Sequence, residues 1–440
     1  MQRSLLIVAF LGGTSVADRL PDPAPDAPPA EPPVEPPAAP TPAPAPPTPA
    51  APIVAPPLPP PEPELTEAEK IERANYASSS VRFGGFIQTQ YRLREDSGFG
   101  SDTDGFRARA IRVLTRGDTR AGNLELSAFL ETELQPQFDL LDGYGSVARP
   151  LPDHGRFSID LGQMRVPVSR QSMLADWQLA FPDKAQLASI SPIRDLGMRV
   201  TLDLPRPDAK RRRRGSSFRI PKVRLIGGVF NGEGTNVIEN INQKYMWTGR
   251  AEVTVFGEER HLAESAFEGE FLTFAGSYAR NKRNEGDRLD KQTTLGFDIS
   301  GAYKGFSGSF EYLEVRHFQT SLNEEMDDRN TFDFHANGFN AQLCYMLPMK
   351  LAPWKQARLE LGGRVEEIDR NDTIPIATPN DANQSVRGVT AIASYYLRMH
   401  SFKLQAAYTH FKELENQTAG GQEARFKNDQ FLLQATYRLE

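Results

Sequence analysis

The segment Tyr245–Phe256 has the sequence YMWTGRAEVTVF, and its apolar residues recur at every second position. The positions between them include Thr248, Arg250 and Glu252. Because successive side chains of a β-strand point to opposite faces, this alternation predicts a strand with one apolar and one polar face. The same pattern returns in 124–131, 294–303, 358–366 and 430–439. The body of the chain is therefore expected to be all-β and antiparallel.

The alternating runs and the connections between them together predict sixteen strands. They span 82–94, 105–116, 122–133, 138–147, 156–166, 195–204, 221–231, 244–256, 269–280, 292–303, 306–318, 332–347, 357–369, 385–399, 402–413 and 428–439. The fourth, 138–147, has the weakest pattern and rests partly on parity, because an even count places both chain ends on one side of a closed barrel.

Three features favour a transmembrane barrel over a soluble sandwich, which alternation alone would also fit. Strands of about 10 to 13 residues exceed the usual globular length and suit a tilted bilayer crossing. Short turns, such as 117–121 and 304–305, alternate with longer polar connections, such as 232–243 and 281–291. Aromatic residues gather near predicted strand ends, as an interfacial girdle requires: Phe83, Phe86, Tyr91, Trp247, Phe306, Tyr395 and Tyr437. The mean hydropathy of the chain is −0.49, and after the N-terminus the sequence has no apolar run long enough for a membrane helix.

The longest connection between predicted strands is 167–194, PVSRQSMLADWQLAFPDKAQLASISPIR. It is partly apolar, and part of it is compatible with a helix. A sixteen-stranded barrel would otherwise enclose an open aqueous channel. This segment is therefore predicted to fold into the lumen and constrict it.

The chain preceding the barrel has its own organisation. Residues 1–17 read as a secretory signal peptide, with Arg3 before an apolar run and a small-residue cleavage site at 15–17. Residues 18–64 form a Pro/Ala-rich, disordered periplasmic linker, and 22 of the 35 prolines fall within 21–64. Residues 65–79 are expected to hold a short helix, and 80–440 the barrel. The alternative reading of 1–17 is an ordinary apolar N-terminus, and the linker need have no specific function.

The charge of the chain is unevenly distributed. The net charge is −6, yet residues 1–76 hold four Lys/Arg against ten Asp/Glu, which leaves the barrel with 47 residues of each sign. The basic run at 210–214 lies in a predicted periplasmic turn and is expected to be solvated, so no nucleic-acid partner is expected. A phosphate or lipid-headgroup contact is the alternative reading of this run.

No cofactor, metal site or enzymatic chemistry is predicted. Cys344 is the single cysteine, and the six histidines lack metal-ligand spacing. No nucleophile motif, phosphate-binding loop or dinucleotide fingerprint stands out. An outer-membrane lipase or protease would need a Ser/His/acid or carboxylate constellation on one strand rim, which cannot be assembled from this sequence.

Several segments between residues 80 and 240 resemble the phosphate-selective porin O/P family. They are LGQMRVPVSRQSM (161–173), FRARAIRVLTRG (106–117), RDLGMRVTL (194–202) and GGVFNGEGTN (227–236). The C-terminal half matches only as generic barrel strands. The resemblance implies a homotrimeric, sixteen-stranded anion channel whose lumen carries an arginine ladder and a narrow eyelet. It does not imply phosphate selectivity.

Anion passage needs cationic donors in the lumen. The pore-lining or anion-binding candidates are Arg107, Arg109, Arg112, Arg165, Arg170, Arg194, Arg199, Arg250 and Arg364. The alternative is an ordinary polar lining with weak or no selectivity, because Glu125, Glu131, Glu252, Glu360 and Glu366 share the inward faces.

The resulting hypothesis is an outer-membrane porin of a Gram-negative bacterium, with its N-terminal segment in the periplasm. Small hydrophilic solutes, including anions such as phosphate, would diffuse passively through a barrel narrowed by 167–194. Its partners would be outer-membrane lipid and these solutes. The competing hypothesis is a structural protein whose Pro-rich arm tethers the barrel to the cell wall through peptidoglycan.

Overall fold

The computed structural model describes residues 79–94, 104–135, 137–152, 155–204, 221–257, 264–265, 267, 269–285, 288–321, 332–348, 357–370, 385–414, 418–419, 422–423 and 429–439. The expected signal peptide, Pro-rich linker and short helix lie outside these residues, as do the basic run 210–214, His154 and His261.

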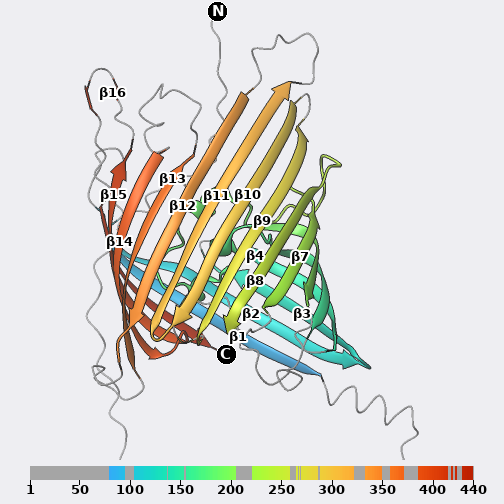
Figure 1. Ribbon diagram of the computed structural model, residues 1–440, viewed down its shortest axis with the longest axis horizontal. Helices are drawn as coiled ribbons and strands as arrows, with labels where there is room; N and C mark the ends of the chain where they lie inside the picture. Colours follow the sequence, from blue (N-terminus) through green and yellow to red (C-terminus); the bar gives the residue numbers. More distant parts are fainter. Residues whose placement is uncertain are drawn as a thin grey trace, which may run out of the picture. The chain divides into compact units, whose positions relative to one another are not determined.

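Sixteen antiparallel strands close into one barrel (Figure 1). They are β1 (Ser80–Arg94), β2 (Gly105–Ala121), β3 (Leu124–Glu133), β4 (Asp139–Pro150), β5 (Arg156–Arg165), β6 (Arg194–Asp203), β7 (Lys222–Phe230), β8 (Met246–Gly257), β9 (Phe271–Glu285), β10 (Arg288–Tyr303), β11 (Phe306–Ser321), β12 (Phe332–Met346), β13 (Arg358–Asp369), β14 (Ser385–Arg398), β15 (Phe402–Glu413) and β18 (Gln430–Leu439). Each predicted strand is confirmed, including the fourth. The ring closes where β1 pairs with β18, with Gly85 opposite Leu439. A separate hairpin joins β16 (Thr418–Ala419) to β17 (Gln422–Glu423).

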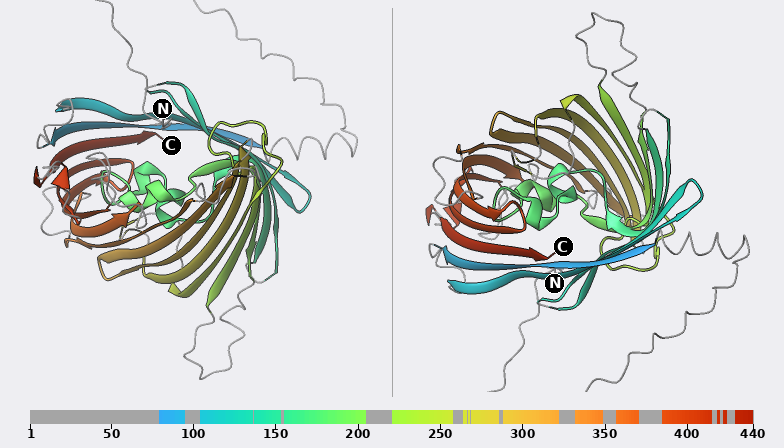
Figure 2. Two further views of the ribbon diagram at one scale, coloured as in Figure 1. Left: turned by 90° about the horizontal axis from the view of Figure 1, so that it is seen from above. Right: turned by 90° about the horizontal axis from the view of Figure 1, so that it is seen from below.

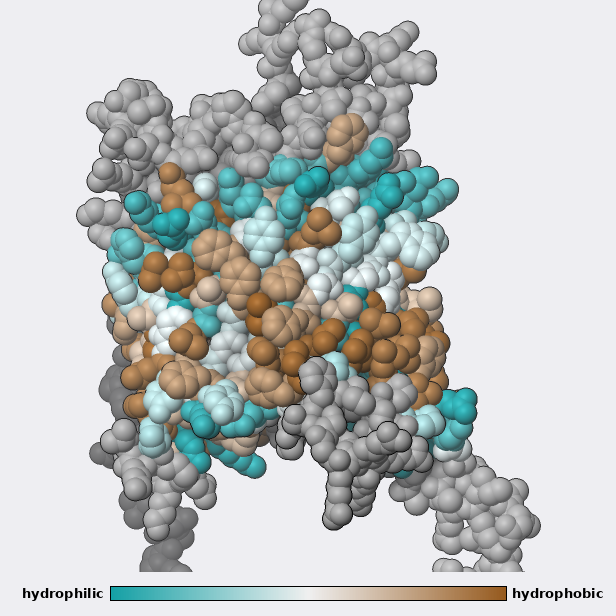
Figure 3. All heavy atoms as spheres, in the orientation of Figure 1, coloured by the Kyte–Doolittle hydropathy of each residue, from teal (hydrophilic) through white to brown (hydrophobic). Residues whose placement is uncertain are grey.

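The strands bury their polar face and expose their apolar face. In β8, Trp247 is 60% exposed whereas Arg250 is 4% exposed. On the side seen in Figure 3, hydrophobic residues form a belt between two hydrophilic rims. This inverted pattern is what a barrel surrounded by lipid requires. Among the described residues, no helix has the length and apolar character needed to cross a membrane.

One expected girdle residue was wrongly assigned. Phe86 faces the lumen and is only 2% exposed, and the guanidinium of Arg112 lies 5.2 Å from its ring centroid. Phe83, Trp247, Phe306 and Tyr437 are exposed, as predicted.

The connections also differ in places from the predicted ones. The expected long loop 281–291 is wrong, because β9 and β10 stay paired as far as Glu285 and Arg288 and only two residues separate them. The turn expected at 117–121 lies later, around Gly122, whose φ of +61° suits glycine at a tight turn. Continued cross-strand pairing extended both strand pairs beyond their alternating sequence.

A β-bulge in β2 explains a break in its alternation. Gln88 pairs with Ala110 and Thr89 with Ala108, so Arg109 is the extra residue. One inserted residue reverses the side on which all later side chains lie. Arg107, Arg109 and Arg112 therefore share the lumen although their spacing does not follow period two.

The connection between β5 and β6, residues 166–193, lies inside the ring of strands and is called the inner loop below. Figure 2 shows it in green within the barrel in both end views. It contains α2 (Arg170–Met173) and the 3₁₀ turns η1 (Asp176–Gln178) and η2 (Gln186–Ile190). Ser169 caps α2 by accepting a hydrogen bond from the Ser172 N–H. The prediction that this segment folds into the lumen is confirmed.

Candidate functional site

The inner loop is held in the lumen by carboxylates that accept hydrogen bonds from its main chain. Glu311 of β11 accepts from the N–H groups of Arg170 (2.7 Å) and Gln171 (3.1 Å). Glu366 of β13 accepts from the N–H of Gln186 at 2.8 Å. These bonds satisfy main-chain donors that an irregular loop cannot pair within itself.

Side-chain donors from two nearby strands, β9 and β15, bind the carbonyl groups of the same loop. Ser277 Oγ donates to the Val168 carbonyl at 2.7 Å. Lys403 Nζ and Gln405 Nε2 donate to the carbonyls of Leu179 (2.5 Å) and Ala180 (2.6 Å). The loop is thus bonded to the wall at several points along its length.

The tip of the inner loop is apolar and sits in an apolar seat. Phe181 is 1% exposed. Its seat comprises inward residues of β12, β14, β15 and β18, namely Cys344, Ile392, Ala407 and Leu432. Arg364 covers the Phe181 ring at 4.7 Å and donates to the Asp183 carbonyl at 2.8 Å. Burial of apolar surface therefore fixes this side of the loop.

Ion pairs fix the other side of the loop. Arg112 binds Glu133 (2.6 Å) and Glu131 (3.0 Å) on the wall and Asp176 (2.5 Å) on the loop. Arg109 binds Asp183 of the loop at 2.8 Å. These arginines join the wall to the loop electrostatically.

A second group of ion pairs lies beside the first. Arg194 binds Asp142 at 3.0 Å, and Arg165 approaches Glu131 at 3.3 Å and Asp142 at 3.5 Å. Arg165 also donates to the Met173 carbonyl at 2.8 Å. These four side chains are called the charged partition below.

The positive charge of these arginines shifts the pKa values of ionisable side chains in the inner loop. Burial by itself would raise the pKa of Asp176, but Arg109 and Arg112 hold that pKa far below its ordinary value. Arg109 likewise outweighs burial and lowers the pKa of Asp183. Burial outweighs the attraction of Asp176 and lowers the pKa of Lys184 to about 7. The repulsion of Arg165 and Arg194 contributes to this lowering.

The described residues 264, 265 and 267, in the connection between β8 and β9, also lie in the lumen. The Glu264 N–H donates to the Gln178 carbonyl at 3.0 Å, and the Glu264 carboxylate accepts from Gln171 Nε2 at 2.5 Å. Phe267 packs edge-on against Tyr396 with 5.0 Å between ring centroids. The sequence did not predict this contact, because the segment 257–268, GEERHLAESAFE, has no alternating pattern that would place it.

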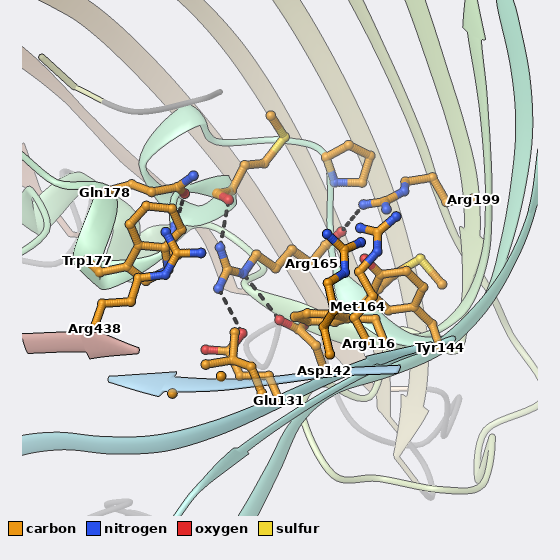
Figure 4. A pocket seen from close by; sticks show the side chains of 18 of the residues that line it. Arg116, Glu131, Asp142, Tyr144, Met164, Arg165, Trp177, Gln178, Arg199 and Arg438 are labelled. Carbon is orange, nitrogen blue, oxygen red and sulfur yellow. Dashed lines mark hydrogen bonds and ion pairs between the residues drawn. The ribbon is translucent and has the colours of Figure 1, made fainter. Parts of the chain in front are cut away.

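Two cavities flank the charged partition. The terminus-side cavity has a volume of about 700 Å³ and reaches Arg82 of β1 and Arg438 of β18. The loop-side cavity has a volume of about 550 Å³ and reaches Gly232 and Arg370. Arg165, Glu131 and Asp142 line the first cavity and Arg194 lines the second, so the partition lies between them. Figure 4 shows residues that line the terminus-side cavity, among them Arg165 with its ion pairs to Glu131 and Asp142.

Comparison with solved structures agrees with this architecture. An anion-selective porin from Comamonas acidovorans aligns with a TM-score of 0.52 at 13% identity, over 82% of this chain and 99% of that one. The chain has the general fold of sixteen-stranded outer-membrane porins. The outer membrane channel DcaP of Acinetobacter baumannii aligns with a TM-score of 0.49 at 14% identity, over 82% and 98% of the two chains.

No family model matches the chain, and no curated protein sequence matches it. The resemblance to the phosphate-selective O/P porins is therefore confirmed only as the general porin fold. Among the described residues, no three or more His, Cys, Asp or Glu side chains are arranged to bind a metal ion.

The nine arginines named from the sequence all face the lumen or lie in the inner loop. Four of them, Arg109, Arg112, Arg165 and Arg194, meet in the ion-paired groups described above. The others have other side-chain partners: Arg107 binds Gln90, Arg199 binds Asp160, Arg250 binds Asp298 and Glu252, Arg364 binds Glu366, and Arg170 is buried in α2. Their expected role in anion binding stays a prediction.

Several residues at this site were missed in the sequence. Asp176 and Lys184 lie in the inner loop, whose inward fold was expected, so their charges could have been assigned to the lumen. Trp177 and Arg438 form a stacked pair with 3.5 Å between the guanidinium carbon and the ring centroid. Because 261 residues separate them in the chain, only the closed barrel brings them together.

Proposed function

We propose that this protein is a passive outer-membrane channel for small hydrophilic solutes with a moderate preference for anions. The single observation that carries the proposal is an excess of arginine in the cavities on both sides of the charged partition. The terminus-side cavity is lined by six arginines and three carboxylates, and the loop-side cavity by three arginines and one carboxylate. A lumen with low-dielectric walls and an excess of positive charge concentrates anions.

The ion pairs limit how strong that preference can be. Arg112 alone contacts three carboxylates, and Arg165 and Arg194 share Glu131 and Asp142. A guanidinium already neutralised by a carboxylate attracts a passing anion less strongly. This pairing supports modest anion selectivity and counts against tight binding of phosphate.

Three further expectations remain predictions. The end of the barrel that holds Ser80 and Leu439 would face the periplasm, the protein would assemble as a homotrimer, and the Pro-rich segment would reach toward peptidoglycan. The tether hypothesis concerns residues outside the described part of the chain.

The test is the reversal potential of the purified full-length protein in a planar bilayer under a potassium chloride gradient. The reversal potential is expected to lie toward the equilibrium potential of chloride. Chloride should be about two to ten times as permeable as potassium, because the excess positive charge is partly neutralised. A reversal potential toward the equilibrium potential of potassium, or no current at all, would overturn the proposal.

A further inference from the structure

We propose that the terminus-side cavity is a binding site for an amphipathic organic anion, a single carboxylate on an aromatic or similarly apolar body. The proposal deepens the proposed function and rests on it, because the anion would reach this site as a solute of the channel.

The size and lining of the cavity fit such a ligand. Its volume of about 700 Å³ lies within the usual range for small-molecule sites, which are mostly apolar with a few placed polar groups. Phe129, Tyr144 and Trp177 contribute apolar surface, and Arg165 and Arg199 contribute charge. An open water-filled pore needs no such aromatic lining.

Two cation–aromatic pairs border the cavity. The Arg438 guanidinium lies 3.5 Å from the Trp177 ring centroid, and that of Arg199 lies 5.9 Å from the Tyr144 centroid. In Figure 4 these pairs lie on opposite sides of Arg165, which lines the same cavity. An aromatic body placed there contacts apolar side chains while its carboxylate reaches a guanidinium.

Arg199 retains the donors that a carboxylate needs. A guanidinium has five N–H donors. Arg199 uses two of them on Asp160, at 3.0 and 2.9 Å, and a third on the Arg165 carbonyl at 3.3 Å. Two N–H groups therefore have no partner among the described residues, and a carboxylate is commonly bound by two such donors.

The same cavity is poorly suited to inorganic phosphate. Glu131, Asp142 and Glu252 line it and would repel a multiply charged anion. Phosphate also has no apolar surface with which to offset the loss of its hydration. A monoanion with an apolar body carries less charge to desolvate and buries surface against Trp177 and Tyr144.

The test is titration calorimetry of the full-length protein in detergent with benzoate, acetate and inorganic phosphate. Benzoate is expected to bind at least about tenfold more tightly than either of the others. The Trp177→Ala variant is expected to weaken benzoate binding about tenfold and to leave acetate unchanged. Trp247→Ala, which removes a tryptophan from the exposed outer face of β8, is the matched control and should bind benzoate as the wild type does.

Equal affinities for the three anions would overturn the proposal, as would unchanged benzoate binding by Trp177→Ala. If that variant fails to form a barrel, judged by its heat-modifiable mobility in SDS, Arg199→Lys takes its place. Lysine keeps the charge but loses the planar fork, so benzoate affinity should fall several-fold. Calorimetry needs no current, so the proposed function can fail in the bilayer while this site is tested independently.

Discussion

The two sides of the lumen hold the same loop by different physical means. Toward β11–β18, Phe181 is buried in an apolar seat and the loop carbonyls accept bonds from Lys403 and Gln405. Toward β2–β6, Arg109 and Arg112 bind loop carboxylates, and the terminus-side cavity lies nearby. Apolar packing excludes water, whereas charged groups remain compatible with a hydrated space.

This difference indicates where solutes would pass. The terminus-side cavity is lined by strands β1 to β8 and the end of β18, and the loop-side cavity by strands from β6 to β12. A route from one cavity to the other would therefore pass through the charged partition, where Arg165 and Arg194 share two carboxylates.

Breaking the charged side should have the largest effect. Arg112→Gln removes the positive charge that compensates the buried carboxylates of Glu131, Glu133 and Asp176. The expected loss of stability is about 3 to 5 kcal/mol. The reversal potential should move toward cations, and the thermal midpoint of the barrel should fall. Arg316→Gln removes an equal charge from the exposed outer face and is the control. Equal behaviour of the two variants would contradict the role given to the charged side.

Breaking the packed side should have a slightly smaller effect. Phe181→Ala empties the apolar seat and should weaken loop docking by about 3 kcal/mol. Local opening would then be roughly a hundredfold more frequent. Hydrogen exchange of peptides from 174–184, measured by mass spectrometry, would report this as faster exchange. Phe297→Ala on the exposed outer face should leave the exchange unchanged, and a similar acceleration there would contradict the prediction.

A change of pH should have the smallest effect. The pKa of Lys184 is about 7 in the docked loop, and its ordinary value is near 10.4. Because the docked loop binds fewer protons between these values, docking should strengthen as pH rises above 7, by on the order of 2 kcal/mol between pH 6 and 9. The ratio of exchange rates between wild type and Lys184→Met, taken at each pH, isolates this effect. A constant ratio would show that Lys184 does not titrate there.

Much of the fold could be predicted because alternation is local. Each barrel strand carries its own period-two pattern, and the length and apolar text of 167–194 indicated an inward loop. The errors arose where pairing with a neighbour overrode local pattern. Turn-like text around 281–291 continued as strand, and Phe86, placed among the interfacial aromatics, faces the lumen beneath Arg112.

The sequence predicted which types of residue line the lumen but not which of them pair with one another. Inward parity identified Arg250 and Arg364, and the bulge at Arg109 accounts for the spacing in β2. No local pattern specifies that Arg112 meets Asp176, 64 residues away, or that Glu311 accepts from Arg170, 141 residues away. Such pairs depend on how barrel closure and loop docking place the strands.

The sequence by itself determined a sixteen-stranded barrel with a polar interior, an apolar exterior and a constricting loop, because strand alternation and loop length are written along the chain. Only the tertiary structure decided which carboxylate neutralises each arginine, where the loop packs tightly, and where Trp177 and Arg438 border an open cavity. The physical reason is that electrostatic pairing and cavity shape depend on distances of a few ångströms between residues remote in sequence. Those distances exist only once the ring has closed.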